Sequence, residues 1–405
     1  MHVLIVGASV AGITTADALR TEGFGGRITV LDAEPHLPYD KPPLSKLALT
    51  PDWNEGRGLL RAESFYKENQ IDLILGRRVE RLDTDRTTAI LETGEQVSAD
   101  AVVLAPGMRA RELPAESMLP GVWSIRNRAD SDGLRAALAG RPRVVVIGGG
   151  FVGAESASTA LSLGSDVTVV EAQGLPFLGL FGGEVAAALA QLQTGRGITL
   201  RTGALVERLE GDGRVEKVVL TDGTVLPADV VVLGLGADPA VDWLRGSNLD
   251  LDDGIACDEF GRTGVSGVYA AGDAAAWWDP PAGRYRRIEH WTRAREQGGA
   301  VAHNIARPES PLKGVAPVPY FWSDQFGHRI QFLGTTEGHD SVTVVHGRLD
   351  GDEFVALYSR AGVVTGALGM SAARHLMPFR TQIAAGASLE SVLEPPVTSL
   401  SGSGE

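Results

Sequence analysis

Residues 143–171 read RVVVIGGGFVGAESASTALSLGSDVTVVE, and they decide the fold of this 405-residue chain. An apolar strand runs into a glycine-rich turn, a helix follows, and a second apolar strand ends in an acidic residue. Residues 2–32, HVLIVGASVAGITTADALRTEGFGGRITVLD, repeat the same order. A strand, a glycine-rich turn and a helix in this order are typical of a dinucleotide-binding unit. The repeat therefore predicts two such units in one chain.

The apolar strands of both units are continuous rather than alternating. Runs such as VVVI at 144–147 and VVVLGLG at 230–236 leave no polar face, which is typical of a parallel sheet covered on both sides. Beyond residue 315, shorter alternating runs predict an antiparallel sheet, followed by a helix from about Ser371. The predicted fold class is therefore α/β, with two Rossmann-like dinucleotide-binding domains and a C-terminal α+β domain.

Composition and charge exclude several classes of protein. A net charge of −14 argues against nucleic-acid binding, which needs a basic footprint. No apolar run approaches about 18 residues, so we expect no membrane span. The first residues, MHVLIVGA, read as a strand rather than a signal peptide, and we expect a cytoplasmic protein. The single cysteine, Cys257, is expected to be a half-buried strand residue; it excludes an internal disulfide, so any redox chemistry depends on a cofactor.

The glycines of the two turns have separate tasks. The first permits the tight turn, the second lets a pyrophosphate approach the backbone, and the third lets the helix pack closely on the strand. Gly148, Gly150 and Gly153 meet all three requirements in the second unit. In the first unit, Gly7 and Gly12 match the first and third positions. Ser9 replaces the middle glycine; its side chain is small enough to point away while its backbone N–H still donates.

An acidic residue at the end of the second strand is expected to bind the ribose of each dinucleotide. In the second unit this residue is Glu171, and no arginine follows it in EAQG. A 2′-phosphate would meet an uncompensated negative charge there, which favours NAD over NADP. In the first unit Asp32 and Glu34 both lie at the strand end, and either can hold the ribose.

Three further stretches carry a likeness to a known family: YDKPPLSK at 39–46, YAAGDAA at 269–275 and PYFWSDQF at 319–326. They resemble those of FAD-dependent, NADH-dependent ferredoxin reductases, which feed bacterial monooxygenases and ring-hydroxylating dioxygenases. Rubredoxin reductases and apoptosis-inducing factor are relatives. The resemblance implies a fold similar to glutathione reductase, with FAD in the first unit and NADH in the second. It implies an FAD domain at 1–112 and 241–314, an NAD domain at 113–240, an interface domain at 315–400 and a flexible tail at 401–405.

The resemblance also implies roles for individual residues. Lys46 would lie near the isoalloxazine ring, Glu155 would face the nicotinamide, and Trp322 would form the gate to the electron acceptor. Asp273 would contact FAD because it is expected to open a helix, and Trp291 would contribute its backbone. The predicted cofactor-binding residues are Gly7, Ser9, Val10, Ala11, Gly12, Asp32, Glu34, Lys46, Val79, Ala105, Gly107, Arg126, Gly272, Asp273, Glu289, His290, Trp291, Gly148, Gly150, Phe151, Val152, Gly153, Glu155, Glu171 and Gly236.

The acceptor is expected to be an external iron–sulfur ferredoxin, since disulfide reductases of this fold keep a cysteine pair at the flavin and this chain has none. The histidines show no HExxH pairing or comparable spacing, so no metal site is expected. We expect a monomer or weak homodimer. Alternatives are a quinone or oxygen reductase without a protein partner, and a redox-switched binding flavoprotein. A basic docking face is predicted from Arg284, Arg286, Arg287, Arg293, Arg295, Arg374, His375 and Arg380.

Overall fold

The computed structural model describes residues 1–394, apart from the side chains of Glu55 and Glu116. The predicted tail at 401–405 and the end of the predicted interface domain lie outside the described residues. Contacts divide the chain into two compact units, and both dinucleotide-binding units of the sequence belong to the first of them. From here on, the first and second unit mean these two compact units. The first consists of Met1–Pro176 and Thr194–Ala316, and the second of Phe177–Gln193 and the described residues from Pro317 to Glu394.

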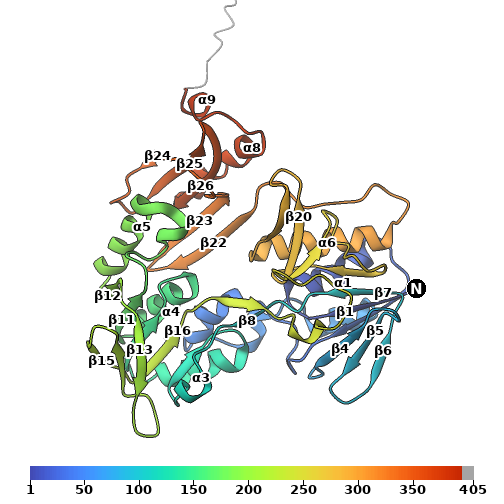
Figure 1. Ribbon diagram of the computed structural model, residues 1–405, viewed down its shortest axis with the longest axis horizontal. Coiled ribbons are helices and arrows are strands. Elements are labelled where there is room, and N and C mark those ends of the chain that lie inside the picture. Colours follow the sequence, from blue (N-terminus) through green and yellow to red (C-terminus); the bar gives the residue numbers. More distant parts are fainter. Residues whose placement is uncertain (395–405) are drawn as a thin grey trace, which may run out of the picture. The chain divides into compact units, whose positions relative to one another are not determined.

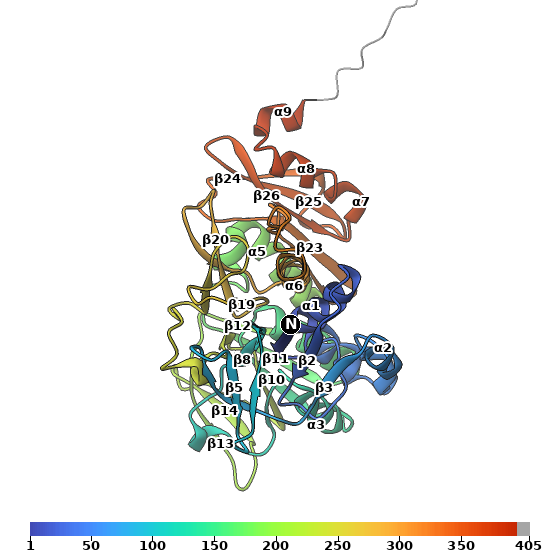
Figure 2. The ribbon, with the colours of Figure 1, turned by 90° about the vertical axis from the view of Figure 1, so that its right-hand side faces the viewer.

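The first unit contains two five-stranded parallel sheets, as the continuous apolar strands predicted. One sheet has the order β19-β7-β1-β2-β3, with strands β1 (His2–Val6), β2 (Arg27–Leu31), β3 (Ile71–Ile74), β7 (Ala101–Leu104) and β19 (Val268–Ala270). The helices α1 (Val10–Thr21) and α6 (Trp291–Ala306) pack side by side against each other (Figures 1 and 2). Their close approach depends on Gly298, because a Cβ there would lie 2.5 Å from the carbonyl oxygen of Ala11.

The other parallel sheet has the order β12-β11-β10-β16-β9. Its elements are β9 (Val122–Ser124), β10 (Arg143–Ile147), β11 (Asp166–Glu171), β12 (Thr199–Thr202) and β16 (Val230–Leu233), with helices α3 (Arg128–Leu138) and α4 (Phe151–Ser162). The side chains from Val144 to Ile147 in β10 and from Val230 to Leu233 in β16 are buried, which is why these two stretches contain only Val, Ile and Leu.

Smaller elements surround and join these sheets. The antiparallel sheet β13-β14-β15 lies in the second Rossmann-like half, and the sheets β4-β5-β6 and β18-β20-β21 lie in the first. The strands β8 and β17 pair with each other where the chain leaves and re-enters the first half. The bounds are α2 (Glu63–Glu68), β4 (Val79–Asp83), β5 (Thr88–Leu91), β6 (Gln96–Ser98), β8 (Met108–Ala110), β13 (Val206–Glu210), β14 (Lys217–Leu220), β15 (Val225–Pro227), β17 (Ala237–Pro239), β18 (Ile255–Cys257), β20 (Ala275–Asp279) and β21 (Arg284–Arg287).

The second unit is built on an antiparallel sheet with the order β22-β23-β26-β25-β24. Helices α7 and α8 pack on β26 (Figure 2). Helix α5 packs on this sheet through Phe181, whose ring lies against Phe332 and whose carbonyl accepts a hydrogen bond from Tyr358. The bounds are α5 (Leu178–Gly195), β22 (Tyr320–Gln325), β23 (His328–Gly334), β24 (Ser341–Gly347), β25 (Phe354–Arg360), β26 (Val363–Met370), α7 (Ala373–Leu376), α8 (Phe379–Ala384) and α9 (Leu389–Leu393).

Two local expectations were wrong. Instead of one helix from about Ser371, the chain forms the three short helices α7, α8 and α9. Pro378 stands between α7 and α8, where it lacks the N–H that would continue a helix, and Gly386 follows α8 with φ +63°. Cys257 is buried rather than half-buried, with 2% of its surface exposed, and burial raises the pKa of its thiol.

Candidate functional site

The two glycine-rich turns have the same backbone geometry. Gly7 adopts φ +107° and Gly148 adopts φ +100°, the region that favours glycine. A Cβ on Gly12 would lie 1.9 Å from the carbonyl oxygen of Gly7, and one on Gly153 would lie 2.0 Å from that of Gly148. The first and third glycines are therefore required by the protein itself, in both turns.

The middle position of each turn has a different requirement. Ser9 and Gly150 both precede a helix in extended backbone, with φ −90° and −70°. A Cβ on Gly150 would meet nothing within 4 Å. Nothing in the protein therefore demands glycine at this position, which explains why Ser9 is accommodated. The predicted residues Val10, Ala11, Phe151 and Val152 form the first turns of α1 and α4.

Each turn is closed by a carboxylate from the end of the neighbouring strand. Asp32 Oδ2 accepts a hydrogen bond from the backbone N–H of Ala8 at 2.5 Å, and Glu171 Oε2 accepts one from Gly149 at 2.8 Å. Asp32 is thus the structural counterpart of Glu171. Glu34 is also near, because a small cavity is lined by Ser9, Asp32 and Glu34, and its carboxylate holds Lys41 at 2.5 Å. Both acids stay candidates for the ribose of the first dinucleotide.

A cavity of about 140 Å³ lies beside the first turn. It is lined by Gly7, Asp32, Val79 and Pro106, among others, so the structure brings the predicted Val79 to the glycine-rich turn. Ala105 stands behind Gly7, and its carbonyl oxygen would lie 2.1 Å from a Cβ on that glycine.

Arg126 lies beside Gly107, and its charge acts on Asp273. A Cβ on Gly107 would lie 2.9 Å from the guanidinium of Arg126, so this glycine makes room for the arginine. Burial raises the pKa of Asp273 to about 6, and the positive charge of Arg126 opposes that rise. Asp273 does not open a helix, contrary to the expectation. Gly272 at φ +86° forms a turn whose N–H donates to Gln297 Oε1 at 2.8 Å, and the chain then enters β20.

The segment 289–291 leads into α6. His290 is the N-cap residue of this helix, and burial together with Arg293 and Arg286 lowers its pKa to about 4. The side chain of Trp291 is engaged within the protein, since the indole Nε1 donates to Asp40 Oδ1 at 2.7 Å. Asp40, which lies directly before the KPPLSK stretch, is a partner that no sequence motif singled out.

Lys46 and Glu155 form an ion pair between the two Rossmann-like halves. Lys46 Nζ lies 2.9 Å from Glu155 Oε1, and the Ser45 hydroxyl donates to Glu155 Oε2 at 2.5 Å. The side chain of Glu155 is only 8% exposed, so it is not the ordinary exposed residue of a first helical turn. Ser45 is a further site residue that the sequence analysis did not single out.

The short stretch that carries Lys46 is fastened to the second half. It forms the 3-10 helices Pro42–Ser45 and Leu47–Leu49. From α3, Ser131 donates to the carbonyl of Leu44 at 2.9 Å and Arg135 donates to that of Ala48 at 2.8 Å. From α4, Thr159 donates to the carbonyl of Ser45 at 3.0 Å. These bonds fix where Lys46 stands relative to the second glycine-rich turn.

The remaining predicted residues belong to other segments of the chain. Trp322 lies on β22 of the second unit, where its ring stacks on Tyr320 with centroids 6.2 Å apart. Gly236 follows β16 with φ +85°. Glu289 forms an ion pair with Arg287 at 2.5 Å.

Three of the seven predicted docking arginines form ion pairs with acidic side chains. Arg286 pairs with Asp279 at 2.8 Å, and Arg287 pairs with Asp253 as well as Glu289. Arg293 is only 5% exposed, so its inclusion in a docking face was wrong: its side chain points into the protein and donates to the carbonyl of Ala316.

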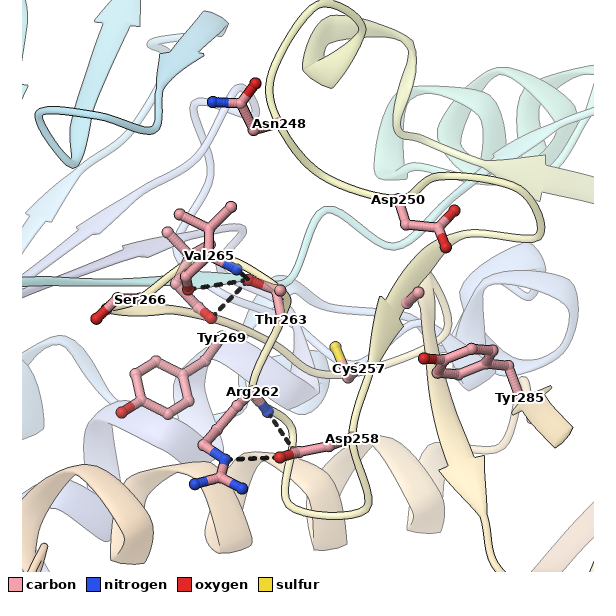
Figure 3. A pocket seen from close by; sticks show the side chains of 14 residues that line it. Asn248, Asp250, Cys257, Asp258, Arg262, Thr263, Val265, Ser266, Tyr269 and Tyr285 are labelled. Atoms are coloured by element: carbon pink, nitrogen blue, oxygen red, sulfur yellow. Dashed lines mark hydrogen bonds and ion pairs between the residues drawn. The ribbon is translucent and has the colours of Figure 1, made fainter. Parts of the chain in front are cut away.

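A third cavity, of about 600 Å³, lies in the first unit (Figure 3). Its lining includes Asn248, Asp250, Cys257, Arg262 and Tyr285. The guanidinium of Arg262 is held by Asp258 at 2.6 Å, so its charge is already compensated. The predicted site residues are not among those that line it.

Two glycine-rich turns of equivalent geometry, each closed by a carboxylate, and a buried ion pair between the two Rossmann-like halves fit two dinucleotides brought toward each other. This arrangement defines the class of oxidoreductases that transfer electrons between a pyridine nucleotide and a flavin. The described residues contain no helix that is long and apolar enough to cross a membrane.

Comparisons with known proteins agree with this class. A family model described as pyridine nucleotide-disulphide oxidoreductase matches residues 1–298, and one described as reductase C-terminal matches residues 320–398. The chain therefore belongs to the pyridine nucleotide-disulphide oxidoreductase family, whose members use a flavin and a pyridine nucleotide.

Two relatives and one solved structure are close in sequence or shape. The ferredoxin–NAD(+) reductase subunit of the benzene 1,2-dioxygenase system of Pseudomonas putida is 38% identical over 338 residues, covering 83% of this chain and 81% of the relative. The ferredoxin reductase component of chlorobenzene dioxygenase of Cupriavidus sp. (strain PS12) is 37% identical, covering 96% and 94%. The covalent putidaredoxin reductase–putidaredoxin complex gives a TM-score of 0.92 at 29% identity, covering 98% and 96%. The predicted resemblance and fold class are confirmed.

Proposed function

We propose that this protein transfers a hydride from NADH to bound FAD and passes the electrons one at a time to an iron–sulfur ferredoxin. The observation that carries the proposal is the Lys46–Glu155 ion pair, which joins the LSK segment of the first dinucleotide unit to the helix after the second glycine-rich turn. The names of the relatives, which are ferredoxin reductase components of oxygenase systems, support the acceptor.

In this proposal the turn at Gly7–Gly12 holds FAD and the turn at Gly148–Gly153 holds NADH. FAD supplies the chemistry, because it accepts a hydride and releases electrons singly. Arg126 and the N–H groups of the first turn bind the FAD phosphates and ribityl chain, with Asp273 beside them. Glu171 binds the adenosine ribose of NADH, and its charge disfavours a 2′-phosphate.

The contribution of Glu155 is positioning rather than acid–base chemistry. Lys46 and Ser45 hold its two carboxylate oxygens, so its charge and direction are fixed before the nucleotide arrives. A fixed carboxylate can accept a hydrogen bond from the nicotinamide carboxamide and orient the ring. Burial of the pair keeps water from competing for these groups.

The electrons leave the protein without a disulfide. Cys257 is the one cysteine of the sequence, and it is buried. Trp322 is proposed as the gate to the ferredoxin. Of the predicted docking arginines, Arg284, Arg295 and Arg374 are exposed and can attract an acidic partner.

The test is a coupled assay with a [2Fe–2S] ferredoxin and cytochrome c as final acceptor. We expect turnover far above the rate without ferredoxin, falling as ionic strength rises. We also expect flavin bleaching under anaerobic conditions to be fast with NADH and much slower with NADPH. Direct quinone reduction at the ferredoxin rate, or slow bleaching accompanied by dimerisation, would contradict the proposal and favour one of the alternatives.

The gate is tested separately. Trp322→Ala should lower the rate of ferredoxin reduction and leave the anaerobic reduction of the flavin by NADH unchanged. Trp278→Ala is the matched control, because this tryptophan is 39% exposed in the first unit and has no proposed role. If both variants behave alike, Trp322 is not the gate.

A further inference from the structure

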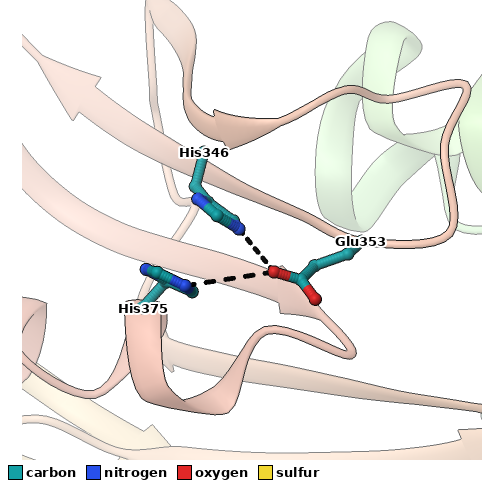
Figure 4. Close-up of side chains that lie close together, drawn as sticks. All are labelled: His346, Glu353 and His375. Atoms are coloured by element: carbon teal, nitrogen blue, oxygen red, sulfur yellow. Dashed lines mark hydrogen bonds and ion pairs between the residues drawn. The ribbon is translucent and has the colours of Figure 1, made fainter.

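Two histidines and a glutamate that are distant in sequence meet in the second unit. They are His346, Glu353 and His375, and their donor atoms all lie within 4.8 Å of one another. Figure 4 shows both imidazole rings directed at the same carboxylate. The sequence spacing gave no sign of this group, because its members come from β24, the residue before β25, and α7.

A β-bulge aims His346 at the other two residues. Val344 pairs with Ala356, but His346 pairs with Val355, so one extra residue is inserted in β24 at this point. Val345 and His346 therefore both face the side of the sheet on which Val355 packs against Leu376. Without the insertion, the alternation of strand residues would turn His346 to the opposite face.

Helix α7 carries the second histidine to the same face. Leu376 is fully buried and anchors the helix on β26, where a Cβ on Gly369 would lie 3.2 Å from the Leu376 side chain. His375 precedes this anchor, and its ring stacks on that of His346 with centroids 3.7 Å apart and planes inclined by 15°. Glu353 stands two residues before Val355 and so faces the same side.

The two carboxylate–imidazole separations bracket the value expected for a tetrahedral site. Metal–nitrogen bonds of about 2.0–2.1 Å place neighbouring tetrahedral ligand atoms about 3.3 Å apart. Glu353 Oε1 lies 2.5 Å from His346 Nε2 and 4.0 Å from His375 Nε2. Metal binding therefore requires a rearrangement in which this oxygen moves away from His346 and toward His375, and the stacked rings turn so that both Nε2 lone pairs converge on the ion.

The surroundings allow an ion to enter. The three side chains are 31–40% exposed, so ligand desolvation is modest and water can occupy a fourth position. Arg374 Nε now donates to His375 Nε2 at 2.9 Å and must move away when that nitrogen binds an ion. Arg374 is exposed, so its displacement costs little packing. Nearby, His328 lies 3.7 Å from Asp352, whose side chain is 93% exposed and directed to that histidine.

We propose that His346, Glu353 and His375 bind a divalent transition metal, for which zinc is the best match. Two imidazoles and one carboxylate with an open position suit Zn²⁺, whereas Ca²⁺ and Mg²⁺ prefer oxygen ligands. The ion fastens the end of β24, the start of β25 and α7 to one another. It takes no part in electron transfer, because zinc is redox-inactive.

The test is zinc binding to the tag-free FAD-loaded protein after treatment with a chelator and desalting. Isothermal titration at pH 7.5 should show one equivalent of Zn²⁺, with affinity reduced at least about tenfold by Glu353→Gln and by His375→Asn. The midpoint of thermal unfolding should rise with zinc in the wild type and not in these variants. Reduction of the flavin by NADH should be the same with and without zinc.

Asp352→Asn is the matched control, since it removes the same charge one residue away and should keep zinc binding intact. Equal zinc affinity in wild type, Glu353→Gln and His375→Asn would overturn the proposal, as would absence of a saturable site in the wild type. A stability change between pH 5 and 8 that depends on both histidines, with no response to zinc, would identify a proton-binding cluster instead.

Discussion

Replacing Glu155 by glutamine is expected to slow the reduction of the flavin by NADH about 10- to 150-fold. Glutamine keeps an acceptor for the Ser45 hydroxyl but removes the negative charge that lies 2.9 Å from Lys46. The two side chains are only 20% and 8% exposed, so water screens their interaction poorly. A hydrogen bond to a charged group contributes about 1.5–3 kcal/mol, which corresponds to this range of rates if the interaction is needed to orient the nicotinamide.

The assay is anaerobic stopped-flow absorbance of the FAD-loaded variant at saturating NADH, which isolates the limiting rate of flavin reduction. Glu63→Gln is the matched control. Glu63, the first residue of α2, also forms an ion pair with a lysine, Lys67, at 2.8 Å, but its side chain is 62% exposed. That variant should keep the wild-type rate. In a double-mutant cycle, Lys46→Gln combined with Glu155→Gln should cost little more than the larger single change. A wild-type limiting rate in Glu155→Gln would refute the positioning role.

Three further outcomes follow from the same geometry. Gly153→Ala should abolish binding of the pyridine nucleotide, because its Cβ would lie 2.0 Å from the Gly148 carbonyl oxygen. Gly150→Ser should weaken this binding only slightly. Titration with NAD⁺ measures both effects. Glu171→Gln should reduce the preference for NADH over NADPH in flavin reduction; an unchanged ratio would exclude charge as its cause. The pKa of Asp273 is raised from 3.8 to about 6. The free energy of unfolding of the FAD-free protein should therefore fall by up to about 3 kcal/mol as the pH rises from 4 to 6. Urea unfolding at several pH values measures this dependence, and Asp273→Asn should remove it.

The sign of the Asp273 prediction follows from which state holds the proton more tightly. Above pH 3.8 the unfolded chain loses its proton, while the folded protein keeps it until about pH 6. The free energy of unfolding therefore falls as the pH rises from about 4 to 6, and the contribution of Asp273 does not change above pH 6. Stability that rose over the same interval would show that another group dominates.

The sequence by itself determined the two dinucleotide-binding units and the parallel order of their strands. The requirements at Gly7, Gly12, Gly148 and Gly153 are local: a positive φ, or a Cβ that would meet a carbonyl oxygen a few residues away. Continuous apolar strands likewise report burial directly. Such features can be read from a short window of residues, and the structure confirmed them.

Local rules failed where distant segments decide the outcome. Asp273 follows a turn that resembles a helix start, yet the chain continues as β20, because that strand finds partners in β18 and β21. Arg293 lies in a basic stretch, yet packing of α6 buries it. The neighbouring elements that decide the structure at Asp273 and the burial of Arg293 cannot be recognised from the few residues on either side of them.

Tertiary structure alone decided which groups meet. Ser45 reaches Glu155 across 110 residues, because hydrogen bonds from α3 and α4 fix the segment that carries Lys46. Asp40 likewise meets Trp291, 251 residues further along the chain. His346 joins Glu353 and His375 only because one bulge in β24 reverses the face on which it lies. Sequence periodicity states which face of an element is buried, but the partner across that face is chosen by packing between elements far apart in the chain.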